Sequence, residues 1–295
     1  MRLDIMVPYW GDPAFMKETV NSVLAQDCPD WRLTVIDDAY PDPEIGRWMA
    51  ELNDPRITYL RNEKNAGVVN NYRKCRDLAT GELMMFMGCD DVLMPNYVSA
   101  VLKAHAAHPD AAVIQPGTNM IDEKGLPTVT LADIVKKHVV MPKPGQCRVV
   151  QGEYLAASLL DGDWMYWPAL AFRSDKIRAT DFDDNLKFTH DLAFVLDLVF
   201  AGQQMLLDST VCFTYRRHSS SASAASLFDG RRFADEIRCF HRAQAQAEAL
   251  GWSKAARAAR WRWTSRAHAV VLAFQALFTG RAKFVPHLLA HVVAR

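Results

Sequence analysis

The sequence predicts an α/β fold, in which a doubly wound, mostly parallel sheet carries helices on both faces and a helical extension follows at the C-terminus. Two observations predict it. Before residue 80, apolar segments of strand length alternate with amphipathic segments of helix length, as in sheets whose parallel strands are joined by helices. From about Gly230 onward the pattern becomes helical throughout. The chain has 295 residues, half of them hydrophobic, which suffices for one large domain with an appendage or for two modest domains.

The first elements form three strand–loop–helix units. Strands are expected at Leu3–Val7, where Pro8 should stop the first of them, at Trp31–Ile36 and at Ile57–Leu60. Helices are expected at about Ala14–Ala25, Ile45–Leu52 and Val68–Ala79. A fourth strand is expected over residues 83–87, where five apolar residues in a row suit a strand buried on both faces.

Two adjacent carboxylates, Asp90 and Asp91, follow that central strand. Ligands of open α/β sheets bind beyond the carboxyl ends of the strands, so paired Asp side chains there are placed to hold a metal ion and a phosphate. A solvated turn is the alternative, since Asp is common after any strand. Loops with Pro8-Tyr9-Trp10 and Asp37-Asp38 should reach the same edge, and this convergence favours a ligand site. The sequence has neither the Gly-rich turn of a dinucleotide fold nor a P-loop.

The net charge of zero conceals an acidic body and a basic tail. Residues 231–295 carry 12 Lys and Arg against 3 Asp and Glu, which leaves 22 against 31 in residues 1–230. Such a tail suits anionic phosphate or lipid, and a solvated helical face explains it as well. The six cysteines lack metal-ligand spacing, which favours reduced thiols in the cytoplasm. We expect no signal peptide, no membrane-crossing segment and no nucleic-acid partner.

The chain resembles the family 2 glycosyltransferases of the GT-A fold over roughly residues 1–225. The resemblance is carried by Val7-Pro8-Tyr9, residues 21–26, Val35 to Asp38, Asn65 to Val68, Ala79 to Glu82, and Asp90-Asp91 with Pro95. It implies an inverting enzyme that moves a sugar from a UDP, dTDP or GDP donor to a hydroxyl of a glycan or lipid-linked acceptor. Such enzymes use Mg²⁺ or Mn²⁺, and their expected place is cell-envelope polysaccharide or glycolipid synthesis.

The resemblance also assigns residues to the donor. Pro8, Tyr9 and Asp38 would line the pocket for the nucleotide base, with a carboxylate accepting the ring imide proton, and Asp37 is the alternative acceptor. Arg73 stands where many relatives have Asn. Its guanidinium is expected either to reach the diphosphate or simply to be solvated.

The metal motif of the family is usually Asp-x-Asp, and its first acid is Gly88 in this sequence. Asp90 would then be the direct ligand of Mg²⁺ or Mn²⁺, with Asp91 as a helper that also faces the nucleotide and His218 as a third candidate ligand. Arg216, Arg217 and Ser221 would contact the diphosphate. A flexible Ser-rich hinge is the alternative for this last segment.

Asp191 matches the family's general base, which takes the proton of the acceptor hydroxyl during an in-line displacement. His190 stands where the family usually has Glu, and it is expected to shape the acceptor site or tune Asp191. An N-capping Asp with an incidental His is the alternative. Trp164 and Trp167 could stack on a sugar ring or acceptor lipid, and core packing explains them equally well.

The expected organisation has three parts: residues 1–115 bind the nucleotide sugar, 116–228 bind the acceptor, and 229–295 form a basic, Trp-containing helical tail. Residues 116–150 show no sustained period and suggest an irregular insertion. Apolar and basic residues in the tail suit an anionic membrane surface, here the inner face of the cell membrane. Packing on the catalytic domain and a homodimer contact are the alternatives.

Two rival functions remain open from the sequence. A degenerate, non-catalytic protein that binds sugar nucleotides or glycans would explain Gly88 and His190. A nucleotidyltransferase would need a basic, Gly-rich N-terminal loop, which the sequence lacks.

Overall fold

In the computed structural model, which describes residues 1–143, 145, 147–218 and 230–294, a single sheet of nine strands forms the centre of the molecule. The strands follow the order β3-β2-β1-β4-β8-β6-β9-β5, with β7 paired to β9. Six of them (β1, β2, β3, β4, β6 and β9) run in one direction, while β5, β7 and β8 run the other way. The predicted fold class, a mostly parallel sheet between helices, is confirmed.

The first half of the sheet follows the predicted alternation closely. Its strands are β1 (Leu3–Tyr9), β2 (Trp31–Asp37), β3 (Ile57–Arg61) and β4 (Leu83–Phe86), joined by the helices α1 (Pro13–Leu24), α2 (Glu44–Glu51) and α3 (Val68–Leu78). All four residues of β4 are buried, as expected of a strand covered on both faces. Asp12 caps α1 by accepting the Ala14 N–H at 2.7 Å, and Pro13 follows at the first helical position.

The expectation that Pro8 stops the first strand is wrong, because β1 continues to Tyr9. Pro8 pairs with Ile36 of β2. The position of its missing N–H is on the side of β4. The last hydrogen bond on that side of β1 is donated by the Met87 N–H to the Met6 carbonyl. Since β4 has ended at that level, the proline deprives no neighbouring strand of a hydrogen bond.

The second half of the sheet was only partly foreseen. After β4 come β5 (Val92–Leu93), α4 (Tyr97–Ala107), β6 (Ala111–Ile121), α5 (Leu131–Val135), the π-helix η1 (Lys136–Val140), β7 (Cys147–Val150), α6 (Gly152–Asp161), the 3₁₀ turn η2 (Trp167–Ala169), β8 (Ala171–Arg173), α7 (Ser174–Ile177), α8 (His190–Phe200) and β9 (Gln204–Arg216).

Residues 116–150 are therefore not irregular throughout, as the sequence suggested. The long strand β6 runs through Pro116 and Gly117, and its register against β9 shifts at that point. A Cβ on Gly117 would lie 2.9 Å from the carbonyl oxygen of Ser209 and 3.0 Å from that of Thr210. Gly117 thus permits the close approach of the β9 backbone at the bulge. The Pro-Gly pair also interrupts the pattern of apolar residues by which a strand is predicted from sequence.

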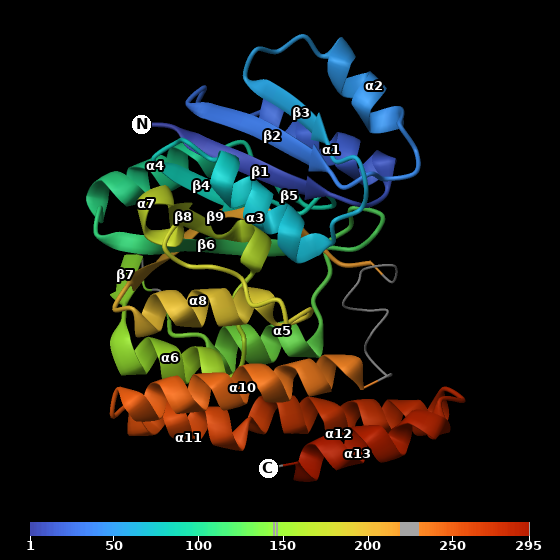
Figure 1. Ribbon diagram of the computed structural model, residues 1–295, viewed down its shortest axis with the longest axis vertical. Coiled ribbons are helices and arrows are strands. Elements are labelled where there is room, and N and C mark those ends of the chain that lie inside the picture. Colours follow the sequence, from blue (N-terminus) through green and yellow to red (C-terminus); the bar gives the residue numbers. More distant parts are fainter. Residues whose placement is uncertain (144, 146, 219–229, 295) are drawn as a thin grey trace.

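The C-terminal residues form a layer of helices at the end of the molecule farthest from β1–β3 (Figure 1). This layer contains α10 (Arg231–Ala249), α11 (Ser253–Trp261), α12 (Trp263–Phe278), the 3₁₀ turn η3 (Ala282–Phe284) and α13 (Val285–Val293). The helices α6 and α8 lie between this layer and the sheet. None of the described helices combines the length and the apolar character that a bilayer span requires.

The tail is attached to the preceding domain through α10 and α11. Arg242 of α10 donates to Asp183 at 2.9 Å and forms an ion pair with Asp197 of α8. Buried residues of α10 and α11, including Cys239, Phe240 and Ala255, belong to the same apolar core as α6 and α8. Packing on the catalytic domain thus accounts for the first half of the tail.

Candidate functional site

The loop after β4 holds the two carboxylates around which the candidate site is built. Asp91 is buried, with its Oδ1 accepting the Arg216 N–H at 2.8 Å, and its carbonyl accepts the Thr19 hydroxyl at 2.8 Å. Burial raises the pKa of Asp91 well above its ordinary value, and the charge of Asp90 adds to this rise. Asp91 therefore fixes the loop to α1 and β9.

Gly88, which replaces the first acid of the expected motif, has a steric role in this loop. A Cβ built on Gly88 would overlap Oδ2 of Asp91 and would lie 2.9 Å from Oδ1 of Asp90. The two carboxylates thus fold back over a position where any side chain would displace them. An acid at position 88 would therefore not fit unless the carboxylates of Asp90 and Asp91 moved.

Asp90 and His218, 128 residues apart in sequence, are brought into contact. Oδ2 of Asp90 lies 2.7 Å from Nε2 of His218, and both side chains are partly exposed. The hydrogen bond to Asp90 is the main cause that raises the pKa of His218. A carboxylate and an imidazole form a two-ligand set for a divalent cation that takes its other ligands from phosphate and water. Among the described residues, no group of three or more His, Cys, Asp and Glu side chains is arranged to hold a metal.

Arg216, the last residue of β9, and Arg217, which follows it, are both engaged with the protein. The buried side chain of Arg216 donates to the Asp90 carbonyl at 2.7 Å, pairs with Glu18 and lies over the Phe15 ring. Arg217 pairs with Asp133. These contacts hold the loop in place rather than leaving guanidinium groups open to a diphosphate. Ser221, the third residue predicted to contact the diphosphate, lies outside the described residues.

Asp37 and Asp38, at the end of β2, are both buried and both hydrogen-bonded within the protein. Asp37 accepts the Tyr40 N–H at 2.7 Å and pairs with Arg61 at 2.5 Å. Asp38 accepts the N–H groups of Ala66 and Gly67 at 2.8 and 2.9 Å, and the Asn62 amide at 2.7 Å. Both carboxylates thus order the loops that surround the expected base pocket.

The exposed aromatic residue of this region is Trp10 rather than Tyr9. Tyr9 is buried, and burial raises the pKa of its phenol. Trp10 is 49% exposed and meets Tyr40 edge-on with ring centroids 5.4 Å apart. A flat surface for a nucleotide base is therefore available on Trp10. The sequence offered the signal, since Trp10 ends the Pro8-Tyr9-Trp10 loop, but it did not distinguish the two rings.

Arg73 is held by the loop before α8. Its guanidinium donates to Asp181 at 2.9 Å, to Asp184 at 2.5 Å and to the carbonyl of Phe182 at 2.5 Å. These contacts join α3 to residues 181–184. Arg73 is therefore neither simply solvated nor turned toward a diphosphate in this structure.

The predicted acceptor tryptophans lie in the core. Trp164 is 1% exposed and donates to the Ser158 hydroxyl at 2.9 Å. Trp167 is 6% exposed and stacks on Phe86 of β4 with ring centroids 5.2 Å apart. Core packing, the alternative left open by the sequence, accounts for both residues, and neither ring presents a face to an acceptor.

Asp191, the predicted base, lies in the first turn of α8 and is partly exposed. Burial raises the pKa of Tyr215, and the charges of Asp91, Asp90 and Asp191 raise it further. The pKa of Tyr215 is thus raised both by the carboxylates after β4, which are the predicted metal ligands, and by Asp191, the predicted base. His190, also predicted for the acceptor side, contacts Tyr72 with ring centroids 5.3 Å apart, and its Nδ1 lies 3.2 Å from the Lys187 carbonyl.

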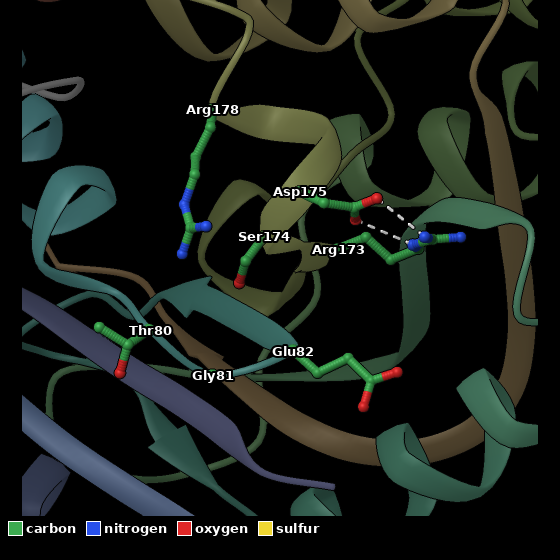
Figure 2. A pocket seen from close by; sticks show the side chains of 7 residues that line it. All are labelled: Thr80, Gly81, Glu82, Arg173, Ser174, Asp175 and Arg178. Atoms are coloured by element: carbon green, nitrogen blue, oxygen red, sulfur yellow. Dashed lines mark hydrogen bonds and ion pairs between the residues drawn. The ribbon is translucent and has the colours of Figure 1, made fainter.

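A pocket of about 360 Å³ lies at the opposite edge of the sheet, where β4 begins and β8 ends (Figure 2). It is lined by Thr80, Gly81, Glu82, Arg173, Ser174, Asp175 and Arg178. Arg173 and Asp175 neutralise each other in a two-fold ion pair at its rim, as Figure 2 shows. The pocket contains none of the predicted site residues, so it is separate from the candidate site.

Comparisons with known proteins point to one family. Residues 4–139 match the model of glycosyl transferase family 2. Over 101 residues the chain is 33% identical to WcaA of Escherichia coli K12, which is provisionally named a colanic acid biosynthesis glycosyl transferase; the match covers 34% of this chain and 36% of WcaA. The chain spans only 14 to 36% of the lengths of the first curated relatives it matches.

Two solved structures share the fold of the whole chain. TarS 1–349 of S. aureus superposes with a TM-score of 0.67 at 14% identity, covering 99% of this chain and 81% of TarS, and it has also been solved with UDP-GlcNAc. The mannosyltransferase PcManGT of Pyrobaculum calidifontis, solved with GDP-Man and Mn²⁺, gives a TM-score of 0.57 at 16% identity, covering 99% and 86% of the two chains. The predicted GT-A-type fold is confirmed by these likenesses.

Proposed function

We propose, from the match of residues 4–139 to the model of glycosyl transferase family 2, that this chain moves a sugar, with inversion, from a nucleoside-diphosphate donor to a hydroxyl of a glycan or lipid-linked acceptor. The observation that carries the proposal is the contact of Asp90 with His218, whose Nε2 lies 2.7 Å from Oδ2 of Asp90, and the charges of Asp90, Asp91 and Asp191 add to the rise that burial causes in the pKa of Tyr215. Neighbours solved with UDP-GlcNAc and GDP-Man support a donor of the UDP or GDP type, and a relative named for colanic acid biosynthesis supports a role in cell-envelope polysaccharide synthesis. A dTDP donor and a role in glycolipid synthesis rest on the family resemblance alone.

In the proposed reaction, Asp191 takes the proton of the acceptor hydroxyl as its oxygen attacks the anomeric carbon. The bond from that carbon to the diphosphate oxygen breaks in the same in-line step, and the electron pair leaves with the nucleoside diphosphate. Asp90 and His218 fit a divalent cation held jointly with the diphosphate, with Mn²⁺ and Mg²⁺ as the candidates. When bound, such a cation neutralises charge that develops on the leaving diphosphate.

The base pocket in this proposal combines an exposed ring with an ordered loop. Trp10 offers the flat surface, while Asp38 and Asp37 keep the flanking loops in place and retain lone pairs that can accept the ring imide proton. Pro8 continues β1 up to this edge of the sheet. Arg216 holds the loop after β4, which carries Asp90, by donating to the Asp91 carboxylate and to the Asp90 carbonyl.

Calorimetric titration with UDP-GlcNAc, GDP-mannose and dTDP-glucose, each with and without Mn²⁺, tests the donor half of the proposal. We expect one of the three to bind, and Mn²⁺ to tighten its binding. Asp90→Asn and His218→Ala should each remove most of the dependence on Mn²⁺. If the wild type binds none of the donors under either condition, the proposal fails.

Gly88 favours one competing function, a protein that binds sugar nucleotides without transferring the sugar. The competing function predicts donor binding in calorimetry with no release of nucleoside diphosphate under any condition. Release of the diphosphate by the wild type would exclude it.

The exposed apolar surface of the outer helices α12 and α13 suggests that the tail binds a partner. Their exposed apolar side chains are Val270, Val271, Phe274, Leu277, Phe278, Leu289 and Val293, and Trp261 and Trp263 are exposed where α11 meets α12. The tail is also basic, with 12 Lys and Arg against 3 Asp and Glu in residues 231–295. We propose that this surface lies on an anionic membrane, because apolar, aromatic and basic side chains together suit the headgroup region. Self-association is the outcome that would replace this proposal.

A further inference from the structure

We propose that Asp235, on helix α10 of the C-terminal layer, is a positioning residue that holds the loop carrying the base Asp191. The inference rests on the proposed function, since it concerns the same transfer reaction. It assigns a catalytic contribution to a helix that lies outside residues 4–139, the segment that matches the family model.

Four hydrogen-bond donors converge on this one carboxylate. Oδ2 of Asp235 accepts the N–H groups of Phe188 at 2.8 Å and Thr189 at 3.0 Å, together with the Thr189 hydroxyl at 3.0 Å. Lys187 donates its N–H to Oδ1 at 3.1 Å. Three consecutive backbone amides therefore point at a side chain that is about 46 residues away in sequence and 2% exposed.

These amides lead directly into the candidate base. Helix α8 begins at His190, its N-cap is Thr189, and Asp191 stands in its first turn. The first N–H groups of a helix and of the loop before it have no partner within the helix, and no side-chain capping bond is present at Thr189. Asp235 supplies the acceptor that this end needs, so it fixes the backbone one residue before His190 and two before Asp191.

The helix that carries this carboxylate is itself attached to the segments around the loop. Arg242, two turns further along α10, donates to Asp183 at 2.9 Å and pairs with Asp197 of α8. The Gln246 amide donates to Asp197 at 3.0 Å. These contacts hold helix α10 to Asp183 before the loop and to Asp197 after it, so Asp235 should keep its position if the loop moves. Charge-assisted hydrogen bonds of this kind are about twice as strong as neutral ones.

The geometry distinguishes positioning from simple stability. The residues proposed to bind the donor, such as Asp90 and Trp10, lie on loops other than residues 187–189, so loosening residues 187–189 should leave donor affinity unchanged. The Asp191 carboxylate should instead become less precisely oriented. A displacement of about 1 Å at a reacting group can lower the rate about 100-fold. The expected signature is a lower kcat at an unchanged KM for the donor.

The test uses the full-length chain and whichever of UDP-GlcNAc, GDP-mannose and dTDP-glucose the wild type turns over. For Asp235→Ala we expect kcat for nucleoside-diphosphate release to fall about 10- to 100-fold, with KM for the donor within about two-fold. Asp235→Asn keeps one acceptor oxygen and should recover part of the rate. Thr189→Val removes one of the four donors, the Thr189 hydroxyl, and should lower kcat less than Asp235→Ala does.

The matched control is Glu248→Ala, an exposed acid on the same helix that contacts Gln244, and it should leave kcat unchanged. Amide hydrogen exchange gives a readout that needs no activity: residues 187–189 should exchange faster in Asp235→Asn, provided its thermal unfolding stays cooperative. A folded Asp235→Asn or Asp235→Ala variant with wild-type kcat, or with unchanged exchange at these amides, would overturn the inference. An inactive wild type would instead refute the proposed function, and hydrogen exchange would still decide whether Asp235 anchors the loop.

Discussion

Replacing Phe274 and Phe278 together with Ser should release the protein from anionic vesicles. The two rings are 64% and 81% exposed on α12. Burying a whole Phe side chain contributes about 1.5–3 kcal/mol, and scaling by the exposed fractions gives about 1–2 kcal/mol for Phe274 and about 1–2.5 for Phe278. The pair should then contribute about 2–4 kcal/mol, which is roughly 30- to 700-fold in the partition constant. Because both rings are already exposed, thermal stability should not fall.

Cosedimentation with vesicles of neutral lipid alone and of neutral lipid with anionic phosphatidylglycerol measures this partition constant. Wild type should bind the anionic vesicles more tightly, and added salt should weaken that binding because the basic side chains contribute to it. The matched control, Val129→Ser with Leu131→Ser, changes two apolar residues of similar exposure (68% and 70%) outside the tail and should bind as wild type does. Equal binding by wild type and the Phe274/Phe278 variant would refute the membrane surface, and a shift from dimer to monomer in that variant would support a dimer contact instead.

Three further predictions concern the site and the tail. Gly88→Asp restores the usual motif on paper, yet its side chain would displace Asp91, so calorimetry should show weaker Mn²⁺-dependent donor binding, and tighter binding would contradict the steric argument. Arg73→Met removes charge-assisted bonds to residues 181–184 and should lower the free energy of unfolding by about 1–3 kcal/mol in urea titrations while leaving donor affinity within about two-fold; a tenfold loss of affinity would point to the diphosphate instead. Burial lowers the pKa of His291 from its ordinary value of 6.5 to about 4. Between these two pH values the unfolded chain binds a proton that the folded chain does not. The free energy of unfolding should therefore fall by up to about 3 kcal/mol as the pH drops through this range. Urea unfolding at about pH 7 and about pH 5, with His291→Phe as the comparison, measures this loss, and an equal loss in the variant would show that other groups cause it.

The first half of the fold could be predicted because each element there is defined by its own residues. Apolar strands of four to seven residues alternate with amphipathic helices, and consecutive parallel strands β1, β2 and β3 pair directly. The second half depends on partners far apart in sequence. Strand β6 pairs with β9 about 90 residues later across a bulge at Gly117, and no local period reveals such a pair.

The candidate site divides in the same way. The acids after β4 and the candidate base Asp191 in α8 are predicted by motif, and the resemblance also suggests His218, which the structure places 2.7 Å from Asp90. Arg73, Trp164 and Arg216 have motif-like positions, but their contacts are tertiary and show them bound to the protein. Asp235 had no signal in the sequence, because an acid next to Glu236 and among the arginines of an amphipathic helix looks like any solvated residue.

The role of Asp191 as the base that drives sugar transfer is tested most directly by Asp191→Asn. The measurement is mass-spectrometric detection of nucleoside diphosphate released from the donor that the wild type binds, alongside calorimetry of that donor for both proteins. We predict that the wild type releases the diphosphate and that Asp191→Asn releases it at least about 100-fold more slowly, which is the lower end of what a general base contributes, with the donor's Kd unchanged. Release by Asp191→Asn at the wild-type rate would contradict the account.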